Sequence, residues 1–132
     1  MYGRIFFPCT EPASIVIPLR PQIIMKDKDR DFSITCRARG KPKPKVRWLQ
    51  NGQEISEDSM LFHVSTTEVV EDNNAFTVQS TLSFAGPSRR ENGLAPGDRG
   101  RYTCEFENGF GESARSEIML RIERKSYLRL TF

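Results

Sequence analysis

Apolar residues recur at every second position in separate stretches of the chain, with polar residues between them. Two of these stretches contain a cysteine: Phe32, Ile34, Cys36 and Ala38 in the first, and Tyr102, Cys104 and Phe106 in the second. This alternation predicts β-strands with one face toward the interior, so both thiols should point into the same core. Another stretch between them places Val46 and Trp48 inward.

Two hairpins are also predicted. Asn51-Gly52 is the strongest short turn signal in the chain and should lead from the tryptophan strand into residues 53–55. Residues 61–70 and 75–84 read as strands, and the polar run 71–74 joins them. They are predicted to form the second hairpin.

The first and last strands complete the pattern. Residues 13–25 contain two short β-rich runs that Pro18 and Pro21 interrupt. Because proline is tolerated only at strand edges and breaks, this segment is predicted to be an edge strand that switches between sheets. The last strand is predicted over residues 112–123. It has Ile118, Leu120 and Ile122 on one face, and Glu117, Met119, Arg121 and Glu123 on the other.

Several motifs occur together in a fixed order. They comprise a cysteine, a tryptophan and a D-x-G-x-Y-x-C run: Cys36, Trp48, Asp98, Gly100, Tyr102 and Cys104. A G-x-P-x-P sequence at 40–44 and an N-x-x-G sequence at 108–111 accompany them. In this combination the chain resembles an immunoglobulin domain of the I-set.

The resemblance implies an all-β fold, an immunoglobulin-like Greek-key β-sandwich of two antiparallel sheets. It also implies a disulfide between Cys36 and Cys104, with Trp48 packed against it, and a tyrosine corner at Tyr102. It covers residues 13–124, which leaves residues 1–12 as a linker or fragment arm. Residues 125–132 are then a tail or linker.

One segment departs from the family pattern. An insert at about residues 86–92 separates the strand ending near Phe84 from the D-x-G-x-Y-x-C run. The insert is polar and includes Arg89-Arg90. We expect a solvated loop, because such loops are long, exposed and inexpensive to close. By family topology it should lie at the opposite end of the domain from Phe110.

The composition indicates an ordinary globular chain. Hydrophobic residues make up 37% and charged residues 28% of the 132 residues, and no apolar run approaches the roughly 20 residues that a transmembrane helix needs. We therefore expect no direct membrane insertion of this segment. Pro8, Glu11 and Pro12 interrupt the place where a signal peptide requires an apolar core. Met1 is accordingly interpreted as the start of a fragment.

The three cysteines are an odd number, so Cys9 is left over if the immunoglobulin pair forms. It is either a linker thiol whose partner belonged to a neighbouring segment or a free or intermolecular thiol. An oxidised Cys36–Cys104 pair would favour an oxidising compartment. Intracellular immunoglobulin modules, however, often keep the same two positions as reduced, buried thiols.

No enzyme site or cofactor is predicted. The single histidine, His63, lies in mid-strand without a sequence-local nucleophile, and it is interpreted as a strand-surface residue. The cysteines are far apart and no C-x-x-C occurs, so no metal site is expected. No phosphate-binding glycine motif is present either.

The sharpest surface feature is a run of cations at every second position: Arg37, Arg39, Lys41, Lys43, Lys45 and Arg47. Period two should place all six away from the core. They would form either a stripe for heparan sulfate or another acidic partner, or a solvated face that protects strands from edge pairing. Glu105 and Glu107 belong to a strand that is expected to neighbour Lys45 and Arg47, so cross-strand pairs could neutralise part of the run. No aromatic residues are interleaved for stacking on bases, so we expect no nucleic-acid partner.

Protein contacts are expected on the sheet that contains the third, sixth and seventh strands. Its outward positions should include Leu49, Thr103 and Met119, and Phe110 at a turn tip is a further candidate anchor. Isolated exposed apolar residues are also common without any function.

Two function classes follow from the resemblance. The first is an extracellular domain of a cell-adhesion molecule or receptor, with homophilic or heterophilic protein contacts. The cysteine pair, the extra cysteine and the basic run favour it. The second is an intracellular structural domain of a muscle or actin-linked protein, which the absence of an N-x-[ST] acceptor favours.

Overall fold

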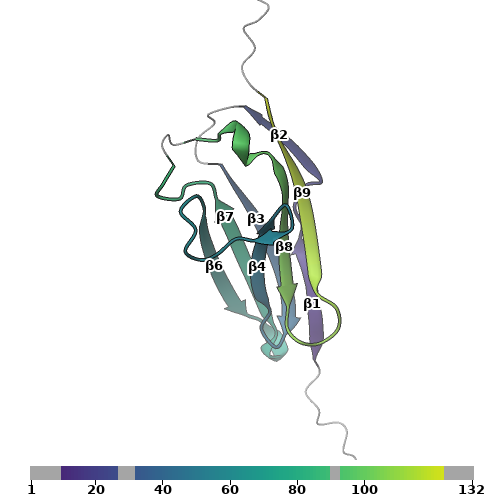
Figure 1. Cartoon of the computed structure of the whole chain (residues 1–132). Coiled ribbons are helices and arrows are strands. Elements are labelled where there is room, and N and C mark those ends of the chain that lie inside the picture. The colour runs from purple at the N-terminus through teal and green to yellow at the C-terminus, as the bar shows by residue number, and fades with distance from the viewer. Residues whose placement is uncertain (1–9, 27–31, 90–92, 124–132) are drawn as a thin grey trace, which may run out of the picture.

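The computed structural model describes residues 10–26, 32–89 and 93–123, which form two β-sheets packed face to face (Figure 1). The four-stranded sheet has the order β1 (Glu11–Ile17), β3 (Ser33–Lys41), β7 (Phe76–Ser83) and β6 (His63–Val70). The five-stranded sheet has the order β2 (Gln22–Lys26), β9 (Ala114–Glu123), β8 (Gly100–Glu107), β4 (Lys45–Gln50) and β5 (Gln53–Glu54). This arrangement is that of an immunoglobulin-like sandwich, so the predicted fold class is confirmed.

The predicted switch of the first strand between sheets is also confirmed. β1 pairs antiparallel with β3, and β2 then pairs with β9 of the other sheet. Pro18 and Pro21 lie in the crossing between them, where a missing N–H disrupts no ladder. The pairing of β2 with β9 is parallel, whereas every other described strand pair is antiparallel.

Both predicted hairpins form. Asn51 and Gly52 adopt positive φ values of 50° and 86°, as a tight turn between β4 and β5 requires. β6 and β7 pair along their whole length through a short 3₁₀ turn, η2 (Asp72–Asn74). A second 3₁₀ turn, η3 (Pro96–Asp98), precedes β8.

The core lies between the sheets and follows the predicted alternation. Fully buried side chains come from both layers: Cys36, Val78, Ser80 and Leu82 from the four-stranded sheet, and Trp48, Tyr102, Cys104, Phe106 and Leu120 from the five-stranded sheet. At one end of the core, the rings of Phe32, Phe62 and Tyr102 surround Phe84 in edge-to-face contacts with centroids 4.9 to 5.1 Å apart.

Some expectations lie outside the described residues. Cys9, Arg90 and the tail 125–132 belong to this group, as does most of the arm 1–12. Within the described ranges, no helix is long and apolar enough to cross a membrane.

Candidate functional site

A disulfide and hydrogen bonds connect the two sheets in the interior of the sandwich. Cys36 of β3 and Cys104 of β8 form the predicted disulfide between the two sheets, across a sequence separation of 68. Next to it, the indole Nε1 of Trp48 donates to Ser80 Oγ over 2.9 Å. Every buried polar side-chain atom in the described part of the chain has a partner. The interior therefore holds the outer surfaces in a fixed arrangement.

Tyr102 occupies the position that the resemblance assigned to a tyrosine corner. Its hydroxyl donates to the backbone oxygen of Asp98 over 2.6 Å and accepts from Gln50 Nε2 over 3.0 Å. Burial raises the pKa of Tyr102, and the nearby Asp98 carboxylate raises it further. The hydroxyl consequently stays protonated and keeps its donor bond over the whole physiological range.

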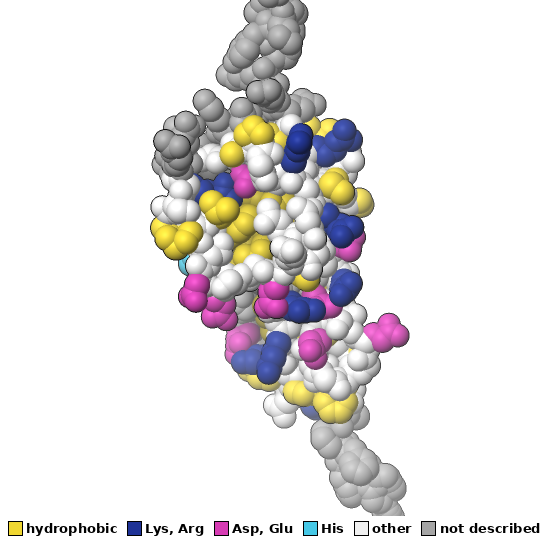
Figure 2. Space-filling model, in the orientation of Figure 1, with side chains coloured by type: hydrophobic (Ala, Val, Ile, Leu, Met, Phe, Trp, Pro, Cys, Tyr) yellow, Lys and Arg dark blue, Asp and Glu magenta, His cyan; other side chains and the backbone are white. Residues whose placement is uncertain are grey.

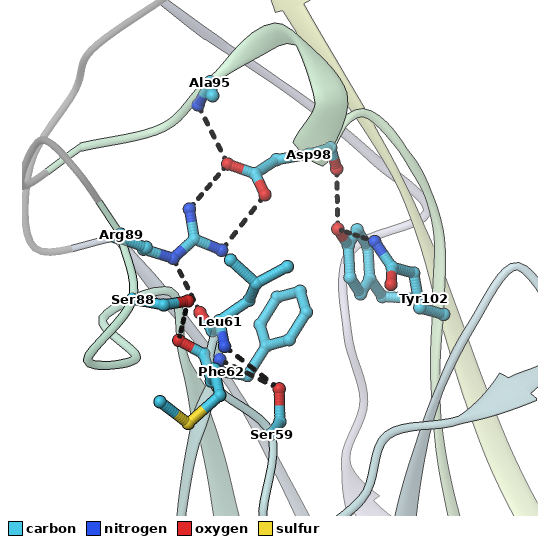
Figure 3. Close-up of polar contacts among 10 residues, drawn as sticks. Ser59, Leu61, Phe62, Ser88, Arg89, Ala95, Asp98 and Tyr102 are labelled. Carbon is cyan, nitrogen blue, oxygen red and sulfur yellow. Dashed lines mark hydrogen bonds and ion pairs between the residues drawn. The ribbon is translucent and has the colours of Figure 1, made fainter.

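The expected solvated insert is wrong for Arg89, whose side chain is only 6% exposed. Its two terminal nitrogens donate to the Asp98 carboxylate over 2.8 and 3.0 Å, and its Nε donates to the Leu61 carbonyl over 2.6 Å (Figure 3). The guanidinium also lies 5.2 Å from the ring centroid of Phe62 and 5.4 Å from that of Phe84. The insert is therefore anchored to the core at this end of the sandwich.

Backbone contacts explain why the insert can reach this position. The Gly86 and Ser88 amides donate to the carbonyls of Leu61 and Met60. A Cβ at Gly86 would lie 2.4 Å from the Leu61 carbonyl carbon, so only glycine permits this approach. The only sign of this contact in the sequence is that Arg89 precedes Asp98 by nine residues. No sequence pattern predicts that these two side chains pair.

The predicted single stripe of cations is wrong, although all six side chains are outside the core. Arg37, Arg39 and Lys41 belong to β3, Lys45 and Arg47 belong to β4, and Lys43 lies in the connecting loop. β3 and β4 are in different sheets, whose outer faces point in opposite directions. The cations keep their spacing of two residues through the loop, but those before and after the loop lie on different outer faces.

Many of these cations also have partners close by. Arg39 Nε lies 3.0 Å from a Glu11 oxygen, and Lys43 Nζ lies 3.0 Å from a Glu68 oxygen. Arg37 donates to the side-chain oxygen of Gln79. Arg39 and Lys43 are therefore each paired with a separate glutamate and do not form a shared positive surface.

Glu105 forms the predicted cross-strand contact with Arg47 and also binds Arg115. Arg47 Nε donates to one carboxylate oxygen, and Arg115 Nε donates to the other over 2.8 Å. Lys45 lies opposite Glu107 in the same ladder. Burial alone would raise the pKa of Glu105, but the hydrogen bonds from the two guanidinium groups outweigh it and lower the pKa.

Two of the three predicted outward positions are not accessible. Leu49 is 9% exposed and Thr103 is 5% exposed, so the expectation of Leu49 as a contact residue is wrong. Both lie on interior strands. Leu49 has Thr103 of β8 on one side and Glu54 of β5 on the other. Neighbouring side chains at that spacing cover one another. Met119 is 41% exposed and Phe110 is 43% exposed.

The two exposed candidates do not share one surface. Phe110 lies in the turn between β8 and β9, whereas Met119 lies in the middle of β9. On β2, Gln22 lies opposite Met119, and Ile24, which is 50% exposed, lies diagonal to Met119 on the same face of the sheet. The sequence analysis did not identify Ile24 as a candidate contact residue. Its position beside β9 follows from the parallel pairing of β2 with β9, which the sequence pattern does not predict.

Arginines border this apolar pair. Arg101 lies opposite Met119 on β8, and Arg121 lies opposite Ile24 on β9. We call Ile24, Arg101, Met119 and Arg121 the Met119 surface. Figure 2 shows one side of the molecule, on which apolar, basic and acidic side chains are interspersed. An apolar centre with a basic border is suited to a protein partner with apolar and acidic groups.

The remaining candidates for chemistry are dispersed. His63 is exposed on β6, as expected for a strand-surface residue. Among residues 10–26, 32–89 and 93–123, no three His, Cys, Asp or Glu side chains are grouped to hold a metal ion.

Comparisons with known proteins agree with this architecture. A family model described as an immunoglobulin domain matches residues 12–108. No curated protein sequence matches the chain significantly.

Three solved structures illustrate the likeness. Titin domains Z1Z2, solved in complex with telethonin, give a TM-score of 0.66 at 21% identity, covering 89% of this chain and 50% of that chain. The titin I-band fragment I67-I69 gives 0.62 at 29% identity, covering 87% and 34%. The N-terminal Ig1-2 module of the Drosophila receptor protein tyrosine phosphatase DLAR gives 0.57 at 22% identity, covering 87% and 50%. This chain thus spans half or less of each of these three chains.

Proposed function

Because this chain belongs to the immunoglobulin domain family, we propose that it is a non-catalytic protein-interaction module. We further propose that it comes from the extracellular region of a cell-adhesion molecule or cell-surface receptor and acts by surface complementarity. The observation that carries the compartment is the Cys36–Cys104 disulfide, because disulfides persist in oxidising surroundings and are rare in the cytosol. The quoted motifs support the I-set subtype.

The arrangement of the chain ends supports a place among other domains. β1 begins at Glu11 at one end of the sandwich, and β9 ends at Glu123 at the other (Figure 1). A domain with this geometry can be joined to neighbours on both sides in an extended row. In this proposal residues 13–124 are the interaction module, and residues 1–12 and 125–132 connect it.

The Met119 surface is the proposed contact site for a protein partner, homophilic or heterophilic. It combines two half-exposed apolar side chains with two arginines on one face of β2, β9 and β8. A Met119→Asp variant of a multimerised domain should bind intact cells at least about tenfold more weakly, because it introduces a charge into an apolar contact. Met60→Asp is the matched control, since Met60 is 56% exposed and lies outside this surface. Equal binding by both variants would reject the site.

The compartment is tested by counting thiols in protein from its native source. The protein is denatured without reductant in an excess of alkylating agent, and the labelled cysteines are identified by mass spectrometry. One alkylated thiol at Cys9, with Cys36 and Cys104 joined, is the expected result. Three alkylated thiols would reject the extracellular assignment.

A second candidate is an intracellular structural domain of a muscle or actin-cytoskeleton protein. Its support is the likeness to titin domains, which reaches 29% identity for the I67-I69 fragment. Titin Z1Z2 was solved with telethonin, so an intracellular counterpart of this chain would also bind a protein. The finding of three free thiols would favour this candidate.

Heparan sulfate is the weakest of the proposed ligands. The six cations of the basic run are divided between two faces, and several contact carboxylates. A polyanion site requires like charges that are clustered on one surface. Lys43→Glu with Lys45→Glu should therefore leave elution from heparin unchanged beyond the general effect of net charge, for which Arg20→Glu with Arg99→Glu is the control.

A further inference from the structure

β6 is the longest strand that lies at a sheet edge without an irregularity. Its eight residues pair with β7 in an unbroken register, and no described strand lies on its other side (Figure 1). Of the other three edge strands, β1 contains Pro12 and two register shifts, β2 has five residues, and β5 has two. A free edge presents a row of backbone N–H and C=O groups, which is a template for another strand.

The composition of β6 favours strand pairing. Five of its eight residues are β-branched, and it contains no proline, glycine or lysine. Val69 and Val70 are 59% and 60% exposed, the highest values among the large apolar side chains. The single acid, Glu68, is already paired with Lys43 Nζ at 3.0 Å. The usual protections of an edge against pairing are therefore weak here.

We propose that β6 pairs antiparallel with β6 of a second copy of this chain, across a two-fold axis that places Thr67 opposite Thr67. This contact joins the two four-stranded sheets and lies on a different sheet from the Met119 surface. It is therefore independent of the function proposed above. An antiparallel pair of identical strands is isologous, so each copy supplies both halves of every contact.

Side-chain complementarity selects this register. The opposed pairs would be Val64 with Val70, Ser65 with Val69, Thr66 with Glu68, and His63 with Glu71. The ends thus combine an apolar pair and a histidine–carboxylate pair that can hydrogen-bond, and no like charges are directly opposed. An axis at Thr66 would place Val64 opposite Glu68, and an axis at Glu68 would oppose two carboxylates. A shift by one residue would turn the outer face of one sheet to the other side.

The outer face of the strand is compatible with this contact. Ser65 and Thr67 lie beside Thr81 and Gln79 of β7, and these side chains are short or already extended along the sheet. The larger side chains on this face of β6 are His63 and Val69, which the register places opposite Glu71 and Ser65 of the second copy. A small side chain opposite a larger one fits the close spacing of opposed residues.

The test uses the full chain with Cys9→Ser, so that intermolecular disulfides at Cys9 do not contribute. Sedimentation equilibrium over a range of concentrations should give a mass that rises from 15.1 kDa toward twice that value. Ser65→Glu with Val69→Glu would oppose like charges twice across the axis and should raise the dimer dissociation constant about tenfold or more. Ser65→Lys with Val69→Glu makes the same opposed pairs complementary and should restore dimerisation.

Circular dichroism spectra check that the double variants are folded. Both variants change only exposed positions, so their spectra should match that of the parent. A parent chain that is monomeric at every concentration would overturn the proposal. So would a dimer that the double glutamate variant leaves unchanged. As a second measurement, Thr67→Cys should form a disulfide-linked dimer on air oxidation, whereas Val70→Cys, which would lie opposite Val64, should form no disulfide link between copies.

Discussion

Arg89–Asp98 and Arg39–Glu11 are both ion pairs with two hydrogen bonds, but their surroundings are very different. In each pair, two guanidinium nitrogens reach two carboxylate oxygens, at 2.8 and 3.0 Å in the first and at 3.0 and 3.4 Å in the second. The side chains of the first pair are 6% and 9% exposed, whereas those of the second are 36% and 42% exposed. The comparison separates the effect of geometry from the effect of solvent.

The difference teaches that burial, rather than the ion pair itself, sets what breaking a contact does. In water, either partner of an exposed pair recovers its solvation when the other is removed. In the interior, the remaining charge has neither its partner nor water. Arg89 in addition joins the insert to the aromatic cluster, so its loss also separates two segments.

The largest effect is expected from Arg89→Met. This change should lower the free energy of unfolding by about 3 to 5 kcal/mol, because it leaves the Asp98 carboxylate buried without its cation. Chemical denaturation measures it, with exposed Arg99→Met as the control. Adding Asp98→Asn to Arg89→Met should recover part of the loss. A single variant as stable as the parent would show that this pair behaves like an exposed one.

Glu105 lies between the two extremes, because its carboxylate is 7% exposed while its partners are about half exposed. Glu105→Gln should lower the free energy of unfolding by about 1 to 2 kcal/mol at neutral pH. Because folding lowers the pKa of Glu105, its stabilising contribution is complete above the ordinary value of 4.5 and is lost as the pH falls through the lower folded-state pKa. Stability below pH 4.5 should therefore fall less steeply in the variant, which denaturation curves at several pH values can measure.

The smallest effect is expected from Arg39→Ala. The Glu11 carboxylate would simply return to water, so the unfolding midpoint should stay within experimental error of the parent. Thermal unfolding of the variant and of Glu11→Ala checks this expectation at low and moderate salt. A midpoint that falls as far as it does for Arg89→Met would show that the comparison rests on something other than burial.

The alternation of residues was sufficient to predict most of the fold. Phe32, Ile34 and Cys36 face inward as expected, and Asn51-Gly52 turns the chain as its left-handed preference requires. The prolines at 18 and 21 correctly indicated a strand that changes sheets. Each of these predictions depends on a few adjacent residues and on the geometry of one strand or turn.

The candidate surfaces were predicted less well. The six cations kept their alternation across the loop at Lys43, but the chain changes sheets there, and a pattern in the sequence does not contain that change. Leu49 has the spacing of an outward residue, yet its neighbours on both sides cover it. Ile24 lies diagonal to Met119 only because β2 pairs parallel with β9.

By itself, the sequence determined which residues form most of the strands and which face of each strand is apolar, and its family resemblance implied that Cys36, Cys104 and Trp48 meet in the core. Only the tertiary structure decided that Arg89 is buried, that the basic run is divided, and that β6 has a free edge. The physical reason is the range of the interactions. Strand periodicity is a property of consecutive residues, whereas burial and charge pairing depend on which distant segments the two sheets bring together.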